Sequence, residues 1–368
     1  MSILEGGEKR LEDFRNIAFA TPPDDLQSRH LWSDNFPSWE SPEAVDVTKS
    51  PYNAKGDGYT DDTEAIQKAI EQNSIIFLPK GYYNISAPLT LKPKTKLIGL
   101  ARHLSIITSR AGVRSKGGSI NLDAPLIKSA QSADSDTLIA NLGLHTPYHI
   151  PDTYGLDWQS YGIIRDVNFD TLPPLGGFGK ANDGMKHRRT HPLLLISGNG
   201  SGKIYNFFQD DGYPLAFGKS YSHLAVQDTK GPIAFYQCNL ERSQGESNII
   251  IDRSQHVSFF GLKGEGNKPV MVVRNSSDIN VFGYGGNGAA SEGNYLFIVK
   301  DSPDSTFVNL VDSPRLSGEG SAKHQEGYGV DPNKWQMIQI KDGDALFSSP
   351  YLERPLIIKT SAQVKQSQ

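Results

Sequence analysis

The segment Val257-Ser258-Phe259-Phe260-Gly261 recurs 22 residues later as Ile279-Asn280-Val281-Phe282-Gly283. The preceding stretch, Ile-Ile-Asp-Arg-Ser at 250–254, lies over Val-Val-Arg-Asn-Ser at 272–276 at the same shift. A period in the low twenties, with short strands separated by Gly, Asn, Asp or Ser, is typical of stacked β-solenoid coils. The repeat therefore predicts a coil that returns to the same place once in each period.

Each predicted coil has an inner and an outer set of side chains. Because side chains alternate along a strand, Val257 and Phe259 should be buried against the next coil while Ser258 stays outside. Fainter copies of the repeat occur on both sides, at 139–144 over 164–169 and at 298–302 before 307–310. Leucine-rich repeats have a similar period, but their Leu and Asn ladder is missing. A doubly wound sheet needs helices between the strands, and we find none after Glu71.

Composition agrees with a fold that turns often, because 36 Gly and 22 Pro occur among the 368 residues. The formal charge of −4 gives no bulk attraction to nucleic acid or to an anionic membrane, so neither is an expected partner. Cys238 is the single cysteine, which excludes an intramolecular disulfide and a cysteine zinc cage. No apolar run has signal-peptide or transmembrane length, so we expect the mature form of a secreted or periplasmic protein, written without its leader.

The chain divides into three regions that differ in composition and in hydrophobic periodicity. Residues 1–45 have no sustained period but carry aromatic residues, including Trp32 and Trp39, which favours an arm packed on something larger. Residues 46–360 form the predicted solenoid, and 361–368 a disordered tail. An acidic N-cap with Glu64 three residues after Asp61 predicts a short amphipathic helix at 64–71, with Ala65, Ile66, Ala69 and Ile70 on one face. Short strands follow at 74–79, 81–86 and 95–99.

The stretch 52–70, Tyr-Asn-Ala-Lys-Gly-Asp-Gly-Tyr-Thr-Asp-Asp-Thr-Glu-Ala-Ile-Gln-Lys-Ala-Ile, followed by Ile-Phe-Leu-Pro-Lys-Gly-Tyr-Tyr at 76–83, resembles the opening of the pectate-lyase-like superfamily. This resemblance implies an all-β fold, a right-handed parallel β-helix whose end is capped by the first helix. It also implies that Lys55-Gly-Asp-Gly58 has a structural role.

Five further segments together resemble glycoside hydrolase family 55, the β-1,3-glucanases: Leu-Asp-Trp-Gln at 156–159, Gly-Asn-Gly-Ser-Gly at 198–202, and the segments 231–241, 257–265 and 283–287. That family has two β-helices side by side with the active site at their junction, whereas this chain has length for one. The resemblance implies hydrolysis of a β-linked glucan by an inverting mechanism.

Glu265 matches the general acid of that family. A glycosidic oxygen leaves only when protonated, so hydrolysis needs a carboxylic acid whose pKa is raised by burial or by a nearby negative charge. We place Glu265 just beyond a strand that ends in Gly261, where glycines on either side let the carboxylate project into a groove. The alternative is a solvated glutamate at a turn.

Glu241 precedes Glu265 by about one coil, so the two carboxylates should lie on adjacent rungs about 4.8 Å apart. Glu241 could keep Glu265 protonated by charge repulsion or bind sugar hydroxyls. The alternative is a salt bridge with Arg242 or Arg253.

The family resemblance also implies a Gln and a Ser that hold the attacking water. The matching residues are Gln159, with Ser160 as an alternative alignment, and Ser201. Asp210 lies in the sequence Asp-Asp-Gly, which is typical of a turn; the alternative is that Asp210 lies at the groove and acts as the catalytic base. All of these could equally be ordinary polar residues at turns.

Sugars present apolar C–H faces, so aromatic platforms should line a substrate groove. The candidates lie in or next to the motif segments, with polar neighbours that could bind hydroxyls; core packing is the alternative for the aromatic residues. The set of substrate-binding candidates is Trp158, Tyr161, Tyr236, Gln237, Asn239, Asp210, Tyr284 and Asn287.

No cofactor or metal is expected. Gly198 to Lys203 is one residue short of a phosphate-binding loop, and the pair His187 and His191 lies in a predicted loop rather than on a helix. The basic cluster 186–189 reads as a solvated loop. Cys238, within a strand-like run, reads as a small core residue.

Three functions are compatible with these residues. The first is an inverting glycoside hydrolase whose partner is a polysaccharide or oligosaccharide. The second is a polysaccharide lyase acting on uronates, with Arg188, Arg189, Lys263 or His187 as the basic group. The third is a non-catalytic carbohydrate-binding β-helix. Assembly of the chain with copies of itself, a homo-oligomer, stays open.

Overall fold

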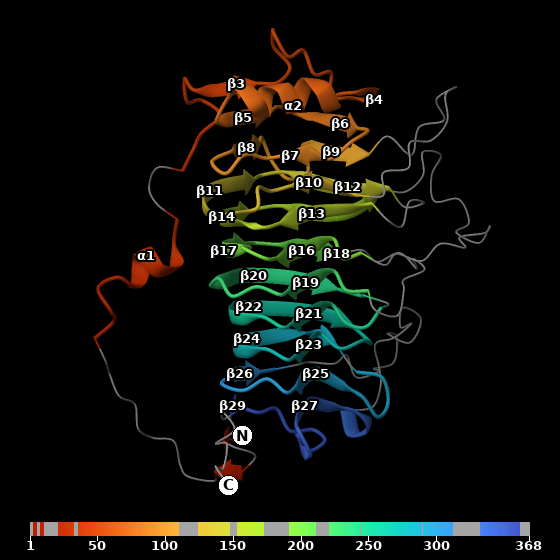
Figure 1. The fold of residues 1–368 in the computed structure, drawn as a ribbon. Coiled ribbons are helices and arrows are strands. Elements are labelled where there is room, and N and C mark those ends of the chain that lie inside the picture. Colours follow the sequence, from red (N-terminus) through yellow and green to blue (C-terminus); the bar gives the residue numbers. More distant parts are fainter. Residues whose placement is uncertain are drawn as a thin grey trace, which may run out of the picture.

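The computed structural model describes residues 3–5, 8–10, 21–32, 36–109, 124–147, 153–172, 191–210, 221–243, 245–288, 290–311 and 332–360. Its strands stack rung on rung into a parallel β-helix (Figure 1). The expected fold class, an all-β right-handed parallel β-helix with an N-terminal capping helix, is confirmed. Within the described ranges no helix is long and apolar enough to cross a bilayer.

Each coil has three sides, which we number in chain order. The first side is a ten-stranded sheet. Its strands are β7 Leu89–Thr90, β10 Pro125–Lys128, β13 Tyr154–Trp158, β16 Leu194–Ser197, β19 Leu224–Gln227, β21 Ile249–Asp252, β23 Met271–Arg274, β25 Tyr295–Lys300, β27 Gln336–Asp342 and β28 Ala345–Ser348.

The second and third sides belong to one 19-stranded sheet that bends between them. The second side comprises β3 Ala44–Asp46, β5 Ile75–Leu78, β8 Lys96–Gly99, β11 Ser132–Ala140, β14 Ser160–Arg165, β17 Ser201–Tyr205, the N-terminal halves of β20 Ile233–Glu241, β22 Gln255–Gly266 and β24 Ser277–Gly288, then β26 Thr306–Leu310 and β29 Ile357–Lys359. The third side comprises β4 Asp57–Asp61, β6 Gly81–Ile85, β9 Ser105–Ser109, β12 Gly143–Pro147, β15 Asn168–Leu172, β18 Phe208–Asp210 and the C-terminal halves of β20, β22 and β24.

From β11 onward, one left-handed residue in each coil makes the bend between the second and third sides. At Gly261 φ is +73° and at Gly283 it is +84°, and Asn206 and Asn309 adopt φ near +54° on other coils. Glycine and asparagine tolerate this conformation best, because a larger side chain is strained there. Part of the high glycine content thus reflects a corner that is repeated from coil to coil.

The predicted repeat register is confirmed. Val257 pairs with Ile279 and Phe259 with Val281, and all four side chains lie in the core. On the first side Ile250 pairs with Val272 at the same shift. Phe235 and Phe259 stack with ring centroids 4.4 Å apart inside the core, so aromatic ladders fill the solenoid as well as aliphatic ones.

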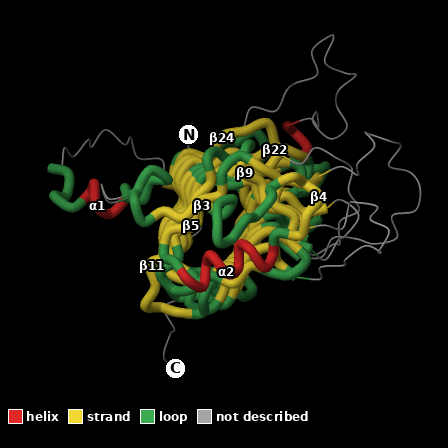
Figure 2. The backbone as a smooth tube through the Cα atoms, turned by 90° about the horizontal axis from the view of Figure 1, so that it is seen from above, coloured by secondary structure: helices red, strands yellow, loops and turns green. Residues whose placement is uncertain are grey.

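Helix α2, Thr63–Gln72, lies across the end of the solenoid (Figures 1 and 2) and buries Ile66, Ala69 and Ile70 against the first coils. The predicted capping box is wrong, because the N-cap is Asp62 and its carboxylate makes no bond within the helix. That carboxylate accepts hydrogen bonds from the backbone N–H groups of Lys55 and Gly56, at 2.6 and 2.9 Å. Lys55 and Gly56 therefore serve the end cap, as the resemblance implied. The remaining short elements are the strands β1 Ile3–Glu5 and β2 Glu8–Arg10 and the single-turn helix η2 Pro332–Lys334.

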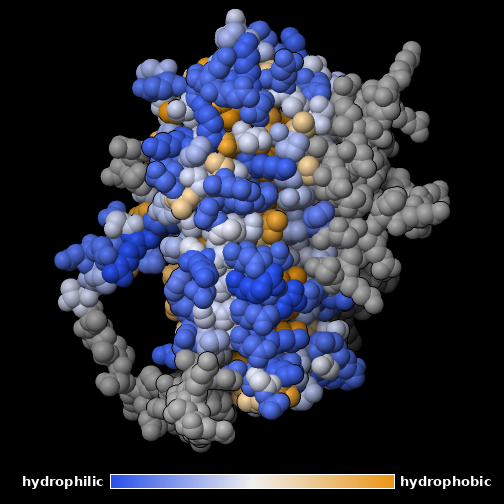
Figure 3. Space-filling view, in the orientation of Figure 1, coloured by the Kyte–Doolittle hydropathy of each residue, from blue (hydrophilic) through white to orange (hydrophobic). Residues whose placement is uncertain are grey.

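The N-terminal segment runs along the outer surface of the second side. Trp39 stacks on Phe77, with ring centroids 6.1 Å apart, and Trp32 meets Tyr205 edge to face at 5.0 Å. Arg165 places its guanidinium 4.1 Å from the ring centre of Trp32. Helix α1, Leu26–His30, follows at the level of β17 to β22 and presents a hydrophilic surface to solvent (Figure 3).

Candidate functional site

Glu241 and Glu265 lie side by side on the third side. The two residues are register partners on the adjacent strands β20 and β22, and both point away from the core because their neighbours Leu240 and Gly264 point into it. Their side chains are only 3% and 13% exposed. The expectation that Glu265 lies just beyond the end of its strand is wrong. Strand β22 continues through the corner at Gly261 and contains Glu265 near its end. A rigid strand, rather than a loop, therefore positions the carboxylate.

Lys263 joins the two carboxylates. Its Nζ donates to Oε1 of Glu241 and, over 2.7 Å, to Oε1 of Glu265. Burial alone would lower the pKa of Lys263, but the hydrogen bonds to both glutamates and their charges outweigh burial and raise it. Arg242 adds a second cation, with Nη2 3.4 Å from Oε2 of Glu265 and 3.7 Å from Oε2 of Glu241. Both cations stabilise the ionised form of both carboxylates.

Buried polar groups hold the backbone at this point. Nε2 of His223 lies 2.7 Å from the carbonyl oxygen of Glu241, and the Asn248 amide donates to the carbonyl oxygen of Leu240 over 2.8 Å. The Arg242 N–H donates to the carbonyl oxygen of Glu265 over 2.8 Å, which ties the two rungs together. These contacts fix the backbone positions from which the Glu241 and Glu265 side chains project.

The same outward face contains three more residues expected from the sequence. Asp210 is the register partner of Glu241, and Asn287 is that of Glu265; their side chains lie outside the described residues. Asn239 is the register partner of Lys263, and its buried Oδ1 has no hydrogen-bond partner among the described residues. The structure therefore places Asp210, Glu241, Glu265 and Asn287 in one column, and Asn239 beside Lys263 in the neighbouring column.

Two residues extend this column toward the capped end. His145 and Asp170 are register partners on β12 and β15, and the register of Asn168 with Phe208 places Asp170 next to Asp210. His145 is buried, and neither ring nitrogen has a hydrogen-bond partner in the described part of the chain. Burial lowers the pKa of His145 to about 4, partly opposed by the charge of Asp170, so the imidazole is neutral near pH 7.

Buried polar atoms without a partner among the described residues gather on this side of the solenoid. Besides those of His145 and Asn239, they include Oγ1 of Thr108 and Oγ of Ser109 on β9 and Nη1 of Arg102 just before it. Buried polar atoms are normally hydrogen-bonded, so each of these needs a partner that the described chain does not supply. Water or a hydroxyl-rich ligand meets this requirement.

The two residues expected to hold the attacking water are not part of this cluster. Gln159 lies at the corner between the first and second sides, where its Nε2 donates to the carboxylate of Asp157 at 3.1 and 3.2 Å. Ser201 begins β17 at the same corner, is buried, and donates to the carbonyl of Asn199. Ser160, the alternative to Gln159, is also buried there and donates to the carbonyl of Ala130. Gln159, Ser160 and Ser201 thus lie at a different corner of the coil from Glu265 and cannot share a site with it.

All four expected aromatic platforms are buried or lie on another side of the coil. Trp158 is a core residue whose Nε1 donates to the carbonyl oxygen of Ser201, and Tyr284 is a core residue packed against Phe297. Tyr236 lies on the second side beneath helix α1. Tyr161 is exposed, but also on the second side. Gln237 occupies the left-handed corner, with φ of +54°, between Tyr236 and the acidic column.

The sequence did contain a signal for Lys263, which was expected only as a possible base of a lyase. Asn239 and Glu241 are two apart, as are Lys263 and Glu265, and one coil period separates the two pairs. Residues two apart share one face of a strand, so a polar pair repeated at the coil period predicts a polar patch on adjacent rungs. Arg242 was an expected alternative partner of Glu241, and that salt bridge is present at 3.7 Å, whereas Arg253 pairs with Asp228 and Asp252. No signal in the sequence identifies His145.

The remaining expectations concern metal binding, the single cysteine and the histidine pair. Among the described residues no group of three or more His, Cys, Asp or Glu side chains is arranged to hold a metal ion. Cys238 is a buried core residue, and burial raises the pKa of its thiol. His191 stacks on Tyr154 with ring centroids 5.2 Å apart. The segment 186–189, with His187, Arg188 and Arg189, lies outside the described residues.

Comparison with known proteins supports the superfamily. Residues 45–205 match the family model described as rhamnogalacturonase A/epimerase, pectate lyase-like. The preneck appendage protein of Bacillus phage PZA is 38% identical over 61 residues, which is 17% of this chain and 7% of that protein. This chain thus spans a small part of the length of that relative. These matches support the pectate-lyase-like superfamily without naming glycoside hydrolase family 55.

Two solved structures are among the similar ones. ORF18 of Geobacillus virus E2 has a TM-score of 0.46 and 17% identity, over 73% of this chain and 53% of that chain. The pre-mature gene product 12 of bacteriophage phi29 has a TM-score of 0.46 and 14% identity, over 80% of this chain and 43% of that chain.

Proposed function

We propose that the protein is a glycoside hydrolase that binds a polysaccharide along the third side and cleaves it with Glu265 as general acid. The observation that carries the proposal is the pair of glutamates on adjacent rungs of one outward column. Glycoside hydrolysis requires two carboxyl groups flanking the scissile bond, and a parallel solenoid places carboxyl groups at fixed intervals along such a column. The orphaned hydroxyl, amide and imidazole groups beside the column suit a ligand rich in hydroxyl groups.

Glu265 is the better acid of the two. It is the more exposed carboxyl, whereas Glu241 is almost completely buried beneath Lys263 and Arg242. A sugar that displaces the Lys263 ammonium from Glu265 removes the nearer of the two positive charges that keep this carboxyl ionised, while Lys263 stays with Glu241. The neighbouring negative charge and the excluded water then favour the protonated form of Glu265.

The proposed reaction proceeds by inversion. Water attacks the anomeric carbon and gives up a proton to a base, while the glycosidic C–O bond breaks and its oxygen takes the proton of Glu265. Asp210 has the register position for the base, because it lies two rungs from Glu265. Two rungs span about 10 Å between backbones, just above the roughly 6.5–9.5 Å between the carboxyl groups of inverting pairs.

The substrate follows from the family resemblance and from the charges of the site. We propose a neutral β-linked glucan of the β-1,3-glucanase type. A uronate-cleaving lyase needs a neutral base near the site, and Lys263 is unsuited to that role because its pKa is raised. Action on such a polymer implies a secreted or periplasmic location.

A second candidate is a non-catalytic carbohydrate-binding appendage, which the local similarity to a phage appendage protein favours. One experiment separates the three functions: incubate the protein with a panel of neutral and acidic polysaccharides, and read reducing-sugar release and ultraviolet absorbance together. Reducing ends without absorbance support the hydrolase. Absorbance from an unsaturated uronate identifies the lyase, and binding without either signal identifies the appendage.

A further inference from the structure

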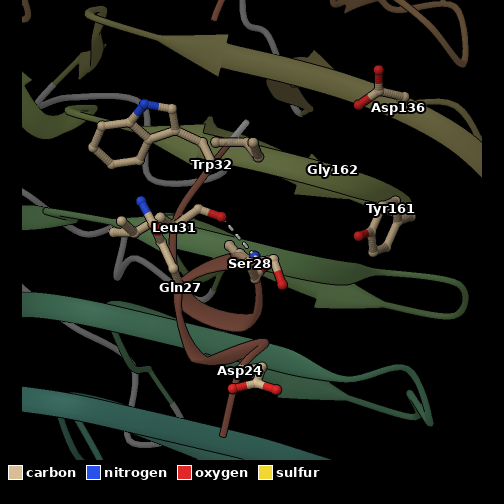
Figure 4. A pocket seen from close by; sticks show the side chains of 10 residues that line it. Asp24, Gln27, Ser28, Leu31, Trp32, Asp136, Tyr161 and Gly162 are labelled. Atoms are coloured by element: carbon tan, nitrogen blue, oxygen red, sulfur yellow. Dashed lines mark hydrogen bonds between the residues drawn. The ribbon is translucent and has the colours of Figure 1, made fainter. Parts of the chain in front are cut away.

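The N-terminal arm and the second side enclose a groove on the side of the coil next to the one that holds Glu265. It consists of two adjoining cavities of about 510 and 440 Å³, and Tyr161 and Lys203 border both of them. Asp24, Gln27, Ser28 and Trp32 form the arm wall of the larger cavity (Figure 4). This combined space is in the range of small-ligand sites, which are roughly 300–1,000 Å³.

The arm wall is held in place by specific contacts. Nζ of Lys203 donates to the carbonyl oxygens of Ser28 and Leu31, both at 2.8 Å. Tyr205 donates its hydroxyl to the carbonyl oxygen of His30 over 2.5 Å, and Nδ1 of His30 lies 2.9 Å from the Tyr236 hydroxyl. The groove is therefore preformed, and a ligand need not order the arm on binding.

The lining has the chemistry that a sugar needs. The ring of Tyr161 is 46% exposed at the junction of the two cavities, so its face is available to the C–H groups of a pyranose. In Figure 4, Asp136 lies above this ring, and Asp24 and Gln27 lie on the arm, across the groove from it. Carboxylate and amide groups accept hydrogen bonds from sugar hydroxyls.

The charges of the lining favour a neutral ligand. The cations that border the groove already have partners: Lys203 binds two carbonyls, Arg29 lies 2.7 Å from Asp25, and His256 lies 2.7 Å from Asp278. Asp136 is paired with Lys96, with Nζ 2.5 Å from Oδ2, and the ammonium of Lys203, bound only to neutral carbonyls, borders the same cavity as Asp24. The lining therefore has no excess of positive charge to attract an anionic sugar, whereas a neutral saccharide needs only the hydrogen-bonding groups.

We propose that this groove is a second carbohydrate-binding site, which holds a neutral oligosaccharide segment with Tyr161 as its stacking platform. The choice of ligand class rests on the proposed function, since the groove would hold another part of the polymer that Glu265 cleaves. The two sites lie on different sides of the coil, separated by the left-handed corner at Gly261. One chain could thus remain attached to a polymer while it acts at the other site.

The test uses the whole chain carrying Glu265→Gln, in which turnover is blocked, and an array of neutral and acidic polysaccharides. Trp32 lines the groove, so its fluorescence should report binding there, and Trp32→Phe should abolish the signal. Adding Tyr161→Ala should weaken neutral-polysaccharide binding at least tenfold. Tyr351→Ala is the matched control, because Tyr351 is 50% exposed in the C-terminal turn before β29 and should leave affinity unchanged.

Three results would overturn the proposal: unchanged affinity in Tyr161→Ala, binding of acidic polysaccharides alone, or no binding across the array. Failure of the hydrolase proposal would look different. In that case the wild-type protein would release no reducing ends, while the Trp32 signal and its dependence on Tyr161 would persist.

Discussion

Glu241 and Glu265 are register partners on adjacent coils, and a single ammonium group, that of Lys263, contacts both carboxylates. The pair is one coil period apart in the chain and one rung apart in space. Two negative charges this close would repel each other strongly at low dielectric, so the cation is needed for both to be ionised. The protonation state of this pair should therefore affect both the rate of hydrolysis and the free energy of unfolding, and each can be measured.

The acid itself is the first target. Glu265→Gln keeps the shape and hydrogen-bonding capacity of the side chain but cannot donate a carboxylic proton. We expect the rate of polysaccharide hydrolysis to fall by about 100-fold or more, since general acid catalysis contributes roughly that much. Reducing-sugar release measures the rate, and circular dichroism checks the fold. Glu292→Gln, at an exposed glutamate, is the control, and more than a few per cent residual activity would contradict the assignment.

Stereochemistry tests the choice of base. We expect inversion, because Glu241 is buried beneath two cations and cannot reach an anomeric carbon, whereas Asp210 has the more distant position that inversion needs. Proton NMR of the first product, recorded before mutarotation, gives the anomer. Retention would instead indicate that Glu241 acts as a nucleophile.

Lys263 should stabilise the fold in a pH-dependent way. The Lys263→Met variant leaves two neighbouring carboxylates without their shared cation. We expect a loss of about 1–2 kcal/mol in the free energy of unfolding at pH 7, because solvent screens part of the charge of this half-exposed ammonium. Because the pKa of Lys263 is raised in the fold, its contribution is complete below the ordinary lysine pKa of about 10.4 and is lost as the pH rises through the higher folded-state value.

Urea unfolding across alkaline pH measures this effect. The wild type should lose stability above about pH 10 more steeply than Lys263→Met. Lys334→Met, which removes an exposed ion pair with Glu292, should reproduce neither change. Equal pH slopes in the wild type and the Lys263→Met variant would rule out a charged bridge.

Two neighbouring glycines make a matched pair for packing. A Cβ at Gly286 would lie 2.0 Å from the carbonyl oxygen of Gly264, directly beneath the Glu265 rung, whereas a Cβ at Gly285 meets no described atom within 4 Å. Overpacking of this kind costs about 1–3 kcal/mol. We expect Gly286→Ala to lower the thermal midpoint and the activity together, and Gly285→Ala to lower neither the midpoint nor the fold integrity. Similar midpoints for the two variants would show that the rungs are not in close contact here.

His145 should make the fold sensitive to acid. Its folded-state pKa of about 4 lies below the ordinary value of about 6.5, so the unfolded chain binds more protons between these values. Stability should therefore be complete above pH 6.5 and fall as the pH drops toward 4, by at most about 3 kcal/mol. His145→Gln should remove this slope in urea unfolding, and His191→Gln, at an exposed histidine, should retain it. An unchanged slope in His145→Gln would assign the acid sensitivity to other groups.

The repeat was predictable because a solenoid uses each coil in the same way. Val257 and Ile279 are similar in sequence because they fill equivalent core positions one rung apart, and the spacing between such residues is the length of a coil. The same logic placed Glu241 over Glu265, because one coil period separates them. Helix α2 was equally visible, since its apolar face repeats at the helical period.

The position of a residue around the coil was harder to predict. Gln159, Ser201 and Glu265 are comparably polar and lie in comparable motifs, yet the first two lie at the corner between the first and second sides and Glu265 lies at the end of the third. The side chains of Trp158 and Tyr284 point from the inner face of their strands into the core, whereas that of Tyr161 points from the outer face into solvent. The sequence motifs around these residues do not show which face each one takes.

The sequence by itself determined the fold class, the coil period and the pairing of two glutamates, because each of these depends on residues separated by one constant interval. The tertiary structure alone decided that Lys263 bridges both carboxylates, that Arg242 reaches Glu265 as well as Glu241, and that the N-terminal arm lies over Tyr205 and Tyr236. The period says which residues are neighbours on adjacent coils, but which of these neighbours bind depends on how their side chains are oriented in the solenoid. The arm contacts join segments whose separation along the chain is unrelated to the period, so no repeat in the sequence records them.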